Sequence, residues 1–198
     1  MTATPAPPPT TPQPGPGPLA GYRRFPNEDG RNRRQAALEV PAMVRSLGLG
    51  RSLRVLEIGC GRGIALPALE RWCRPVRLVG LDPDRALLAE ARAHTSARAC
   101  RAELVEGDVR RIPFPAAAFD LVVDFGTCYH IDHPDRALRE IARVLRPGGL
   151  FVHETRLSQL LAHPVRSWGR RIPWERAPSL QRHRTAGLWS ARLRTARP

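Results

Sequence analysis

The chain has 198 residues, of which 42% are hydrophobic and 25% are charged; these values are typical of one globular domain and exclude wholesale disorder, collagen and coiled coil. No run of 18 apolar residues occurs and the first 20 residues lack the blocks of a secretory signal, so we expect no membrane span and a cytoplasmic protein. The formal net charge of +14 points toward nucleic acid, but all 32 basic residues are arginine; with abundant Ala, Pro and Gly this indicates a genomic composition bias and only weak support for an RNA partner.

The first 50 residues divide into two parts. Residues 1–20 are dominated by proline and threonine and are predicted to be a disordered leader. Apolar residues then recur near helical spacing from residue 32 to residue 47, so residues 21–50 are expected to form an N-terminal helical cap. Pro41 lies inside this pattern and is expected to kink the helix or to begin it. Gly48 and Gly50 would end the helix.

From residue 51 onward, short apolar runs alternate with segments of helical pattern. This alternation predicts right-handed βαβ units, and therefore an α/β fold of the doubly wound, Rossmann-like type, with a parallel sheet and helices on both faces. The link between the third and fourth strands is too interrupted by proline to predict a helix. The expected strands are Leu53–Ile58, Val76–Leu81, Ala102–Val105, Phe119–Phe125 and Leu150–His153, and the expected helices are Ile64–Trp72, Arg85–His94 and Asp135–Leu145.

A glycine loop follows the first expected strand, in the segment 57–63 (EIGCGRG). Ligands of such sheets bind at the carboxyl ends of the strands, and glycines let the backbone turn tightly and approach a ligand closely. The second strand ends in Asp82, 19 residues after Gly63, where an acid can accept hydrogen bonds from ribose hydroxyls. The third strand brings Asp108 to the same edge. A nucleoside pocket is predicted, with the alternatives that Asp82 is a helix N-cap and Asp108 a turn residue.

The spacing of the loop, G-x-G-x-G after an acid, differs from the dinucleotide fingerprint G-x-G-x-x-G and disfavours a nicotinamide-dependent oxidoreductase. Residues 55–63 (VLEIGCGRG) resemble the first motif of class I S-adenosylmethionine-dependent methyltransferases. The resemblance covers about residues 35–155, and it makes residues 51–156 the expected S-adenosylmethionine-binding core. The later motifs that resemble the family are Val79–Asp82, Gly107–Val109 with Ile112–Phe114, Phe119–Val122 and Leu145–Gly149.

The resemblance implies S-adenosyl-L-methionine as the cofactor and assigns a role to each residue that matches a motif. The methionine part would lie on the glycine loop, the ribose beside the second strand, and the adenine beside the third. The implied residues are Glu57, which would orient the loop, the backbone of Gly59, Cys60, Gly61 and Gly63, Asp82 with Pro83 at the ribose, Asp108 and Val109 at the adenine, and Phe125 on the sulfonium and acceptor side.

Methyl transfer from a sulfonium is an in-line displacement in which alignment matters most, so a general base is optional. The candidates for such a base are Tyr129 and His130, which follow the fourth strand, and His153 or Glu154 at the end of the fifth. Tyr129 and Phe125 could also offer aromatic faces to the sulfonium. The alternative is that Tyr129 and His130 pack the mouth of the pocket and that His153 is a satisfied, inward-facing histidine.

The last part of the chain, residues 157–198, is expected to complete the fold. The resemblance implies a C-terminal antiparallel hairpin, but only one strand, residues 186–193, is apparent, so these strands are expected to be antiparallel and partly abbreviated. The segment is rich in arginine and tryptophan, which fits either an RNA-binding surface or tryptophans closing the core. We favour a small-molecule acceptor; the alternatives are an RNA or protein methyltransferase and a non-catalytic S-adenosylmethionine-binding protein.

The four cysteines, Cys60, Cys73, Cys100 and Cys128, have no metal-binding spacing. They are expected to be reduced thiols, mostly buried, and no metal site is expected.

Overall fold

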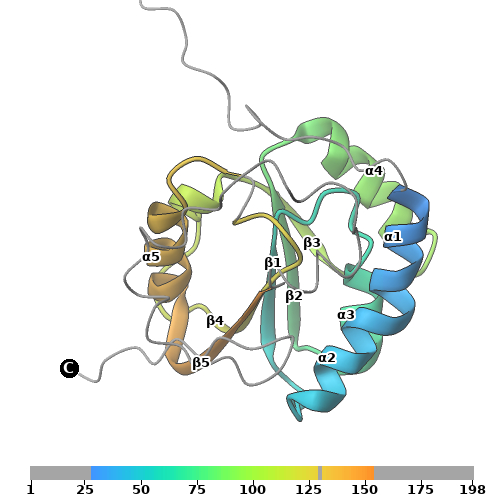
Figure 1. The fold of residues 1–198 in the computed structure, drawn as a ribbon, viewed down its shortest axis with the longest axis horizontal. Helices are drawn as coiled ribbons and strands as arrows, with labels where there is room; N and C mark the ends of the chain where they lie inside the picture. Colours follow the sequence, from blue (N-terminus) through green and yellow to red (C-terminus); the bar gives the residue numbers. More distant parts are fainter. Residues whose placement is uncertain (1–27, 129–130, 154–198) are drawn as a thin grey trace, which may run out of the picture.

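The computed structural model describes residues 28–128 and 131–153 (Figure 1). In these residues five strands form one sheet in the order β3-β2-β1-β4-β5, and every neighbouring pair is parallel. The predicted doubly wound, Rossmann-like fold is thereby confirmed. The strands are β1 (Arg54–Ile58), β2 (Arg77–Asp82), β3 (Glu103–Glu106), β4 (Phe119–Asp124) and β5 (Leu145–His153).

The expected antiparallel C-terminal strand is not found, because the described sheet is parallel throughout. Residues 186–193, for which we predicted this strand, lie outside the described residues, as do the leader (1–20) and the segment 157–198. A second difference concerns β5, which begins at Leu145 and includes the glycines that we expected to form a turn before it. Leu145 pairs with Phe119, and the register then shifts before Leu150 pairs with Leu121. The motif therefore forms an irregular first part of the strand.

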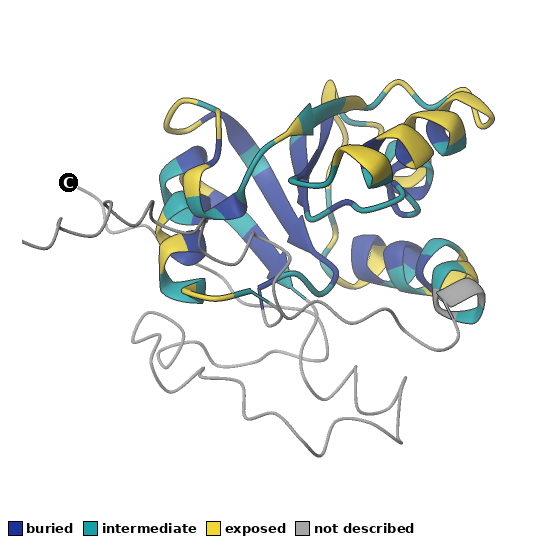
Figure 2. Cartoon of the chain, turned by 90° about the horizontal axis from the view of Figure 1, so that it is seen from above, coloured by how far each residue is buried: buried dark blue, intermediate teal, exposed yellow. Residues whose placement is uncertain are grey.

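Helices cover both faces of the sheet, as Figures 1 and 2 show. The helices α2 (Val40–Ser46), α3 (Leu66–Cys73) and α4 (Arg85–Ser96) pack on one face, while α5 (Pro134–Val144) and the 3-10 turn η2 (Val109–Arg111) pack on the other. Strand side chains alternate between the two resulting cores, so that Val55 joins the first and its neighbour Leu56 the second. The central strands are apolar toward both sides and are buried almost completely.

The N-terminal helical region consists of α1 (Glu28–Arg34), a π-helical turn η1 (Gln35–Glu39) and α2, and it begins earlier than the sequence pattern predicted. The wide turn is closed by the Val40 N–H, which donates to the carbonyl of Gln35. Pro41, which has no N–H to donate, lies in the first turn of α2, directly after the π-helical turn and within the continuous helical stretch 28–46. Gly48, in the left-handed region at φ +56°, ends α2 as expected.

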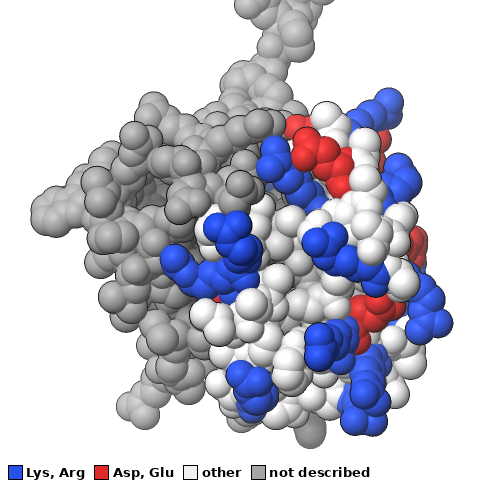
Figure 3. Space-filling view, turned by 90° about the vertical axis from the view of Figure 1, so that its right-hand side faces the viewer, with Lys and Arg blue, Asp and Glu red and all other residues white. Residues whose placement is uncertain are grey.

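Arginines lie in several separate groups over the face that carries α1 to α4, with acids between some of them (Figure 3). Ion pairs join Arg62 to Glu90 at 2.6 Å and Arg85 to Glu106 at 2.6 Å. Among the described residues on this face, the positive charge is therefore divided among separate groups and partly neutralised.

Asp120 joins three strands at the edge of the sheet where the strands begin. Its carboxylate accepts the Arg54 backbone N–H at 2.7 Å and the Arg54 Nε–H at 3.0 Å, and it also pairs with Arg146 of β5. Burial alone would raise the pKa of Asp120, but the hydrogen bonds and charges of the two arginines outweigh it and hold the pKa below 3.8.

We expect Asp120→Asn to lower the free energy of unfolding at pH 7 by about 1 to 3 kcal/mol, because charged hydrogen bonds are lost at a largely buried position. A carboxyl group whose pKa is depressed on folding stabilises the protein above its unfolded pKa, and this contribution is lost as the pH falls through the folded value. Urea unfolding should therefore show a difference between wild type and variant that shrinks below pH 3.8. Asp135→Asn, which removes the exposed pair with Arg139, is the control. Equal stability of the two variants at pH 7 would contradict this account.

Candidate functional site

The glycine loop lies between β1 and α3, at the carboxyl end of the central strand. Since β1 pairs with β2 on one side and with β4 on the other, the loop stands at the topological switch point of the sheet. Gly59, Gly61 and Gly63 have φ values of +60°, +51° and +70°, in the left-handed region that side chains rarely adopt. The turn is closed by the Gly63 N–H, which donates to the Cys60 carbonyl at 2.8 Å. The loop therefore requires glycine on conformational grounds.

The three glycines face different surroundings. A Cβ added to Gly59 would lie 1.9 Å from Thr127 Oγ1, so this position is in direct contact with the loop that follows β4. A Cβ on Gly63 would approach the Ala91 side chain of α4 at 3.1 Å. A Cβ on Gly61 would meet nothing within 4 Å. The backbone at Gly61 therefore faces open space, where a ligand can approach it.

Cys60 packs downward from the loop onto β2. A Cβ added to Gly80 would lie 2.9 Å from both Cys60 Sγ and Leu66 Cδ1, so these side chains fill the space that glycine leaves. Burial and the nearby charges of Glu57 and Asp82 raise the pKa of the Cys60 thiol far above its usual range. All four cysteines are free and three are buried, as expected. Cys60 is therefore a neutral packing residue.

Asp82 links the end of β2 to the glycine loop. Its Oδ2 accepts the Gly61 N–H at 2.8 Å, and its Oδ1 accepts the Asp84 N–H at 2.9 Å. Burial raises the pKa of Asp82 above 3.8, although the two amides partly oppose this shift. The N-cap of α4 is Asp84, which accepts the N–H groups of the first turn, so the N-cap interpretation of Asp82 is wrong. Pro83 lies half-buried between the two acids.

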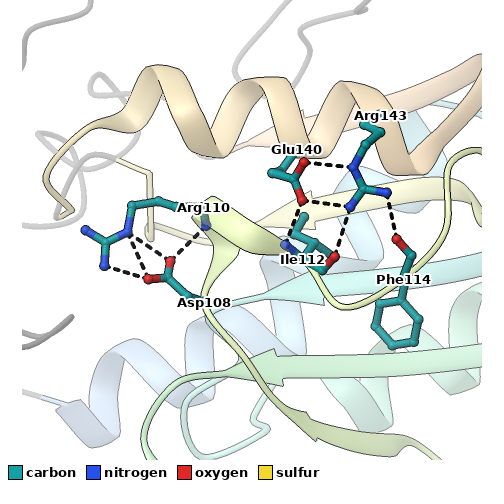
Figure 4. A network of polar contacts seen from close by, with 6 residues as sticks. All are labelled: Asp108, Arg110, Ile112, Phe114, Glu140 and Arg143. Carbon is teal, nitrogen blue, oxygen red and sulfur yellow. Dashed lines mark hydrogen bonds and ion pairs between the residues drawn. The ribbon is translucent and has the colours of Figure 1, made fainter.

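Asp108 lies at the same edge of the sheet, one strand further along. The two strand ends are joined by the Gly107 N–H, which donates to the Asp82 carbonyl at 3.1 Å. Asp108 accepts the Arg110 N–H at 2.8 Å and pairs with its guanidinium at 2.6 Å (Figure 4). Burial alone would raise the pKa of Asp108, but Arg110 outweighs it and lowers the pKa. By accepting the Arg110 N–H, Asp108 makes the contact that the alternative interpretation as a turn residue predicts. Its carboxylate nevertheless lies at this edge of the sheet. The next residue, Val109, is buried.

An ion pair of α5 holds the segment that follows Asp108 (Figure 4). Glu140 accepts the Ile112 N–H at 2.8 Å, and Arg143 donates to the carbonyls of Ile112 and Phe114 at 2.9 and 2.7 Å. The two side chains also pair with each other at 2.7 Å. Sequence reasoning missed this pair, which fixes the chain on the far side of η2.

Two further carboxylates are buried at this edge. Glu57 of β1 is 2% exposed and pairs in register with Gly80 and Val123. Asp124, the last residue of β4, is also 2% exposed. Its carboxylate accepts the N–H groups of three successive residues at 2.8, 2.5 and 3.1 Å, namely Gly126, Thr127 and Cys128. Sequence reasoning missed Asp124, although an acid that ends an apolar strand was the signal that identified Asp82.

The acceptor side is described only in part. Tyr129, His130 and Glu154 lie outside the described residues, so their roles stay predictions. His153 is half-buried at the end of β5, and its ring stacks on Phe151 with centroids 5.4 Å apart. Phe125 is 8% exposed and packs in the core beneath α2 and α3, so its role beside a sulfonium also stays a prediction.

Within residues 28–128 and 131–153, no three His, Cys, Asp or Glu side chains lie where they could hold a metal ion together. None of the helices in these ranges combines the length and the apolar character that crossing a membrane requires.

The site thus extends along the carboxyl ends of four adjacent strands. From β4 to β3 it covers three strand spacings, or about 14 Å. An open glycine loop stands at its centre, and acids follow on β2 and after β3. This arrangement suits an elongated ligand that offers hydrogen-bond donors to the carboxylates along the edge.

Residues 56–153 match the family model described as a methyltransferase domain. The chain is 38% identical over 101 residues to a probable S-adenosylmethionine-dependent methyltransferase of Mycolicibacterium smegmatis, covering 51% of this chain and 37% of that protein. It is also 38% identical over 100 residues to a fatty-acid O-methyltransferase of the same organism, covering 50% of this chain and 36% of that protein. The matched part therefore spans little more than a third of the length of these relatives.

Among solved structures, the PH0226 protein of Pyrococcus horikoshii aligns with a TM-score of 0.59 and 28% sequence identity. The alignment covers 72% of this chain and 69% of that one.

Proposed function

Residues 56–153 belong to the methyltransferase-domain family, of the class I S-adenosylmethionine-dependent type, and on this premise we propose that the chain transfers a methyl group to a small, lipid-like acceptor. The cofactor that follows from this membership is S-adenosyl-L-methionine. The observation that carries the proposal is the open backbone at Gly61, held by the carboxylate of Asp82 at the switch point of the sheet.

The residues present fit this cofactor. A side chain at Gly61 would fill the space that the loop leaves open, and the loop amide there is already turned toward Asp82. A carboxylate has lone pairs beyond those that accept the two amides, so Asp82 can still accept hydrogen bonds from ribose hydroxyls. Asp108, kept charged by Arg110, can accept from an exocyclic amine. The glycine loop would hold the methionine part, and Val109 would lie beside the adenine.

The bound cofactor supplies a methyl group activated by a positively charged sulfur. The protein contributes position. Asp82 fixes the glycine loop against β2, and Glu140 with Arg143 fixes the segment that begins at Asp108. Holding donor and acceptor in line can lower the barrier by about 7 to 11 kcal/mol without a general base. A base would add a further factor of roughly 10² to 10⁴ if the acceptor has to lose a proton, and Tyr129 and His130 stay the candidates for it.

The acceptor class is supported by the relatives, one of which is named a fatty-acid O-methyltransferase. Several others that are 34–36% identical are named phthiotriol/phenolphthiotriol dimycocerosates methyltransferases. Both names describe lipid acceptors. RNA as a substrate stays a prediction from the arginine-rich segment that lies outside the described residues.

The test is to incubate the full chain with S-adenosyl-L-methionine labelled in its methyl group and with separated lipid, RNA and protein fractions of a cell extract. We expect label in the lipid fraction, and no transfer by Asp82→Ala. Label in RNA or protein alone would refute the proposed acceptor class. Calorimetry with S-adenosylhomocysteine runs alongside, and a wild-type chain that binds it without labelling any fraction would be a non-catalytic binding protein.

A further inference from the structure

The buried acids of the described residues are gathered in one place. Glu57, Asp82 and Asp124 are each at most 5% exposed, and they stand on the adjacent strands β1, β2 and β4. Ile58, the residue before the glycine loop, pairs in register with Asp124. The end of β4, which carries Asp124, therefore lies directly beside the start of the loop proposed to hold the cofactor.

The contacts of Asp124 satisfy its oxygens without cancelling its charge. The three backbone N–H groups that donate to it belong to neutral peptides, and the buried Cys128 thiol also bonds to it. A charge that is compensated only by neutral dipoles still acts on its surroundings, and it does so more strongly where water is excluded. Asp124 therefore supplies negative potential at the carboxyl end of β4.

The same contacts orient the peptides that follow β4. A trans peptide is planar, with its carbonyl opposite its N–H, and the described chain contains no cis peptide. Since the N–H groups of residues 126–128 point toward Asp124, the carbonyl oxygens of residues 125–127 point away from it. Thr127 Oγ1 donates to the Ile58 carbonyl at 3.1 Å and lies against Gly59, which keeps this turn next to the glycine loop. The carboxylate of Asp124, buried next to this turn, favours a cation nearby.

We propose that Asp124 is a specificity-determining residue that makes this end of the site selective for positive charge, so that it favours a sulfonium ligand over the neutral thioether. This inference rests on the proposed function, because it takes S-adenosyl-L-methionine as the ligand. When the methyl group leaves, the electron pair of the broken C–S bond stays on sulfur, and the sulfur becomes neutral. A site that prefers the cation thereby binds the donor more tightly, relative to the product, than it would without Asp124.

The test compares three ligands that differ at the sulfur position. S-adenosyl-L-methionine carries a sulfonium there, sinefungin an amine that is protonated at neutral pH, and S-adenosylhomocysteine a neutral thioether. We expect Asp124→Asn to weaken the binding of both cations by on the order of tenfold more than that of the thioether, as measured by calorimetry. Equal losses for all three ligands, or no loss at all, would overturn the proposal.

Two variants separate charge from loop geometry. Thr127→Val removes the hydroxyl that donates to Ile58 but leaves the charge of Asp124, so it should weaken all three ligands to the same extent. Asp124→Glu keeps the charge while changing the geometry, and it should retain the preference for the cations. A preference that is lost in Thr127→Val, or in Asp124→Glu, would contradict a role for the charge.

A further measurement needs no variant and covers the case in which Asp124→Asn does not fold. The wild-type chain should bind sinefungin more tightly than an analogue in which a hydroxyl replaces the amine at the sulfur position, and equal affinity would overturn the proposal. A wild-type chain that binds none of these adenosine ligands would instead refute the proposed function.

Discussion

Replacing Gly59 with alanine is expected to lower the free energy of unfolding by roughly 2 to 5 kcal/mol, through backbone strain at φ +60° and through a steric clash. The new Cβ would lie 1.9 Å from Oγ1 of Thr127 and 2.9 Å from its Cβ. Rotation of the Thr127 side chain cannot relieve the second contact, so the loop after β4 has to move. Because this displacement separates the two loops of the site, we also expect affinity for S-adenosylhomocysteine to fall by about 100-fold.

Alanine substitutions at two other glycines separate the effect of backbone strain from the effect of the steric clash. Gly48→Ala tests strain alone, since Gly48 has φ +56° and open space around it, and it should cost about 1 kcal/mol without affecting the ligand. Gly61→Ala adds the same strain but places its methyl group in the open cradle, so it should reduce binding more than stability. Adding Thr127→Ala to Gly59→Ala should restore part of the lost stability. Equal stability of Gly59→Ala and Gly48→Ala would show that the contact with Thr127 has no energetic weight.

Asp82→Ala is expected to abolish measurable cofactor binding, with a loss of roughly 100-fold or more, because it removes the proposed acceptor for the ribose hydroxyls. It also leaves the N–H groups of Gly61 and Asp84 without their acceptor, at about 1 to 3 kcal/mol each where water does not replace it. Calorimetry and urea unfolding measure the two effects separately. Asp84→Ser, which removes a neighbouring acid but keeps a residue that can cap α4, should bind the cofactor as the wild type does.

The pH dependence of cofactor binding provides a second test of the role proposed for Asp82. Burial raises its pKa above 3.8, so its negative charge is lost at a higher pH than that of an exposed aspartate. We expect cofactor affinity to weaken as the pH falls through this raised value, and Asp82→Asn to show weak binding with no such decline. A wild-type affinity that stays constant throughout the acid range would argue against a charged Asp82 at the ribose.

The strands and the glycine loop were predictable because each is encoded locally. An apolar run of five or six residues that ends in glycines or an acid has few interpretations other than a buried strand. The observed strands differ from the predicted ones mainly at their ends. The start of β5 was missed because its glycines and Pro147 favour a turn, whereas pairing with Phe119 holds the segment in the sheet. The π-helical turn before Pro41 was also missed, since a proline in a helical pattern indicates only a kink or the start of a helix.

Parts of the site depend on pairs that are distant in the sequence. Arg143 reaches the carbonyls of Ile112 and Phe114 across 31 and 29 positions, and no local pattern predicts that contact. Phe125, which is expected to offer an aromatic face, packs in the core beneath α2 and α3, and its role beside a sulfonium stays a prediction. Its neighbour Asp124 was read as part of the strand and turns out to organise the loop that follows.

The absence of a side chain at Gly80 determines how far the glycine loop stands above the sheet. Cys60 and Leu66 fill the volume that glycine leaves, so the side chains at positions 60 and 80 share one space. Gly80→Ala would place a methyl group in this shared space. The side chain at position 60 would then have to be smaller, for example serine or alanine in place of cysteine, or the glycine loop would have to move away from the sheet. The height of the glycine loop above the sheet is thus set by the packing at Gly80, a buried residue in the middle of β2.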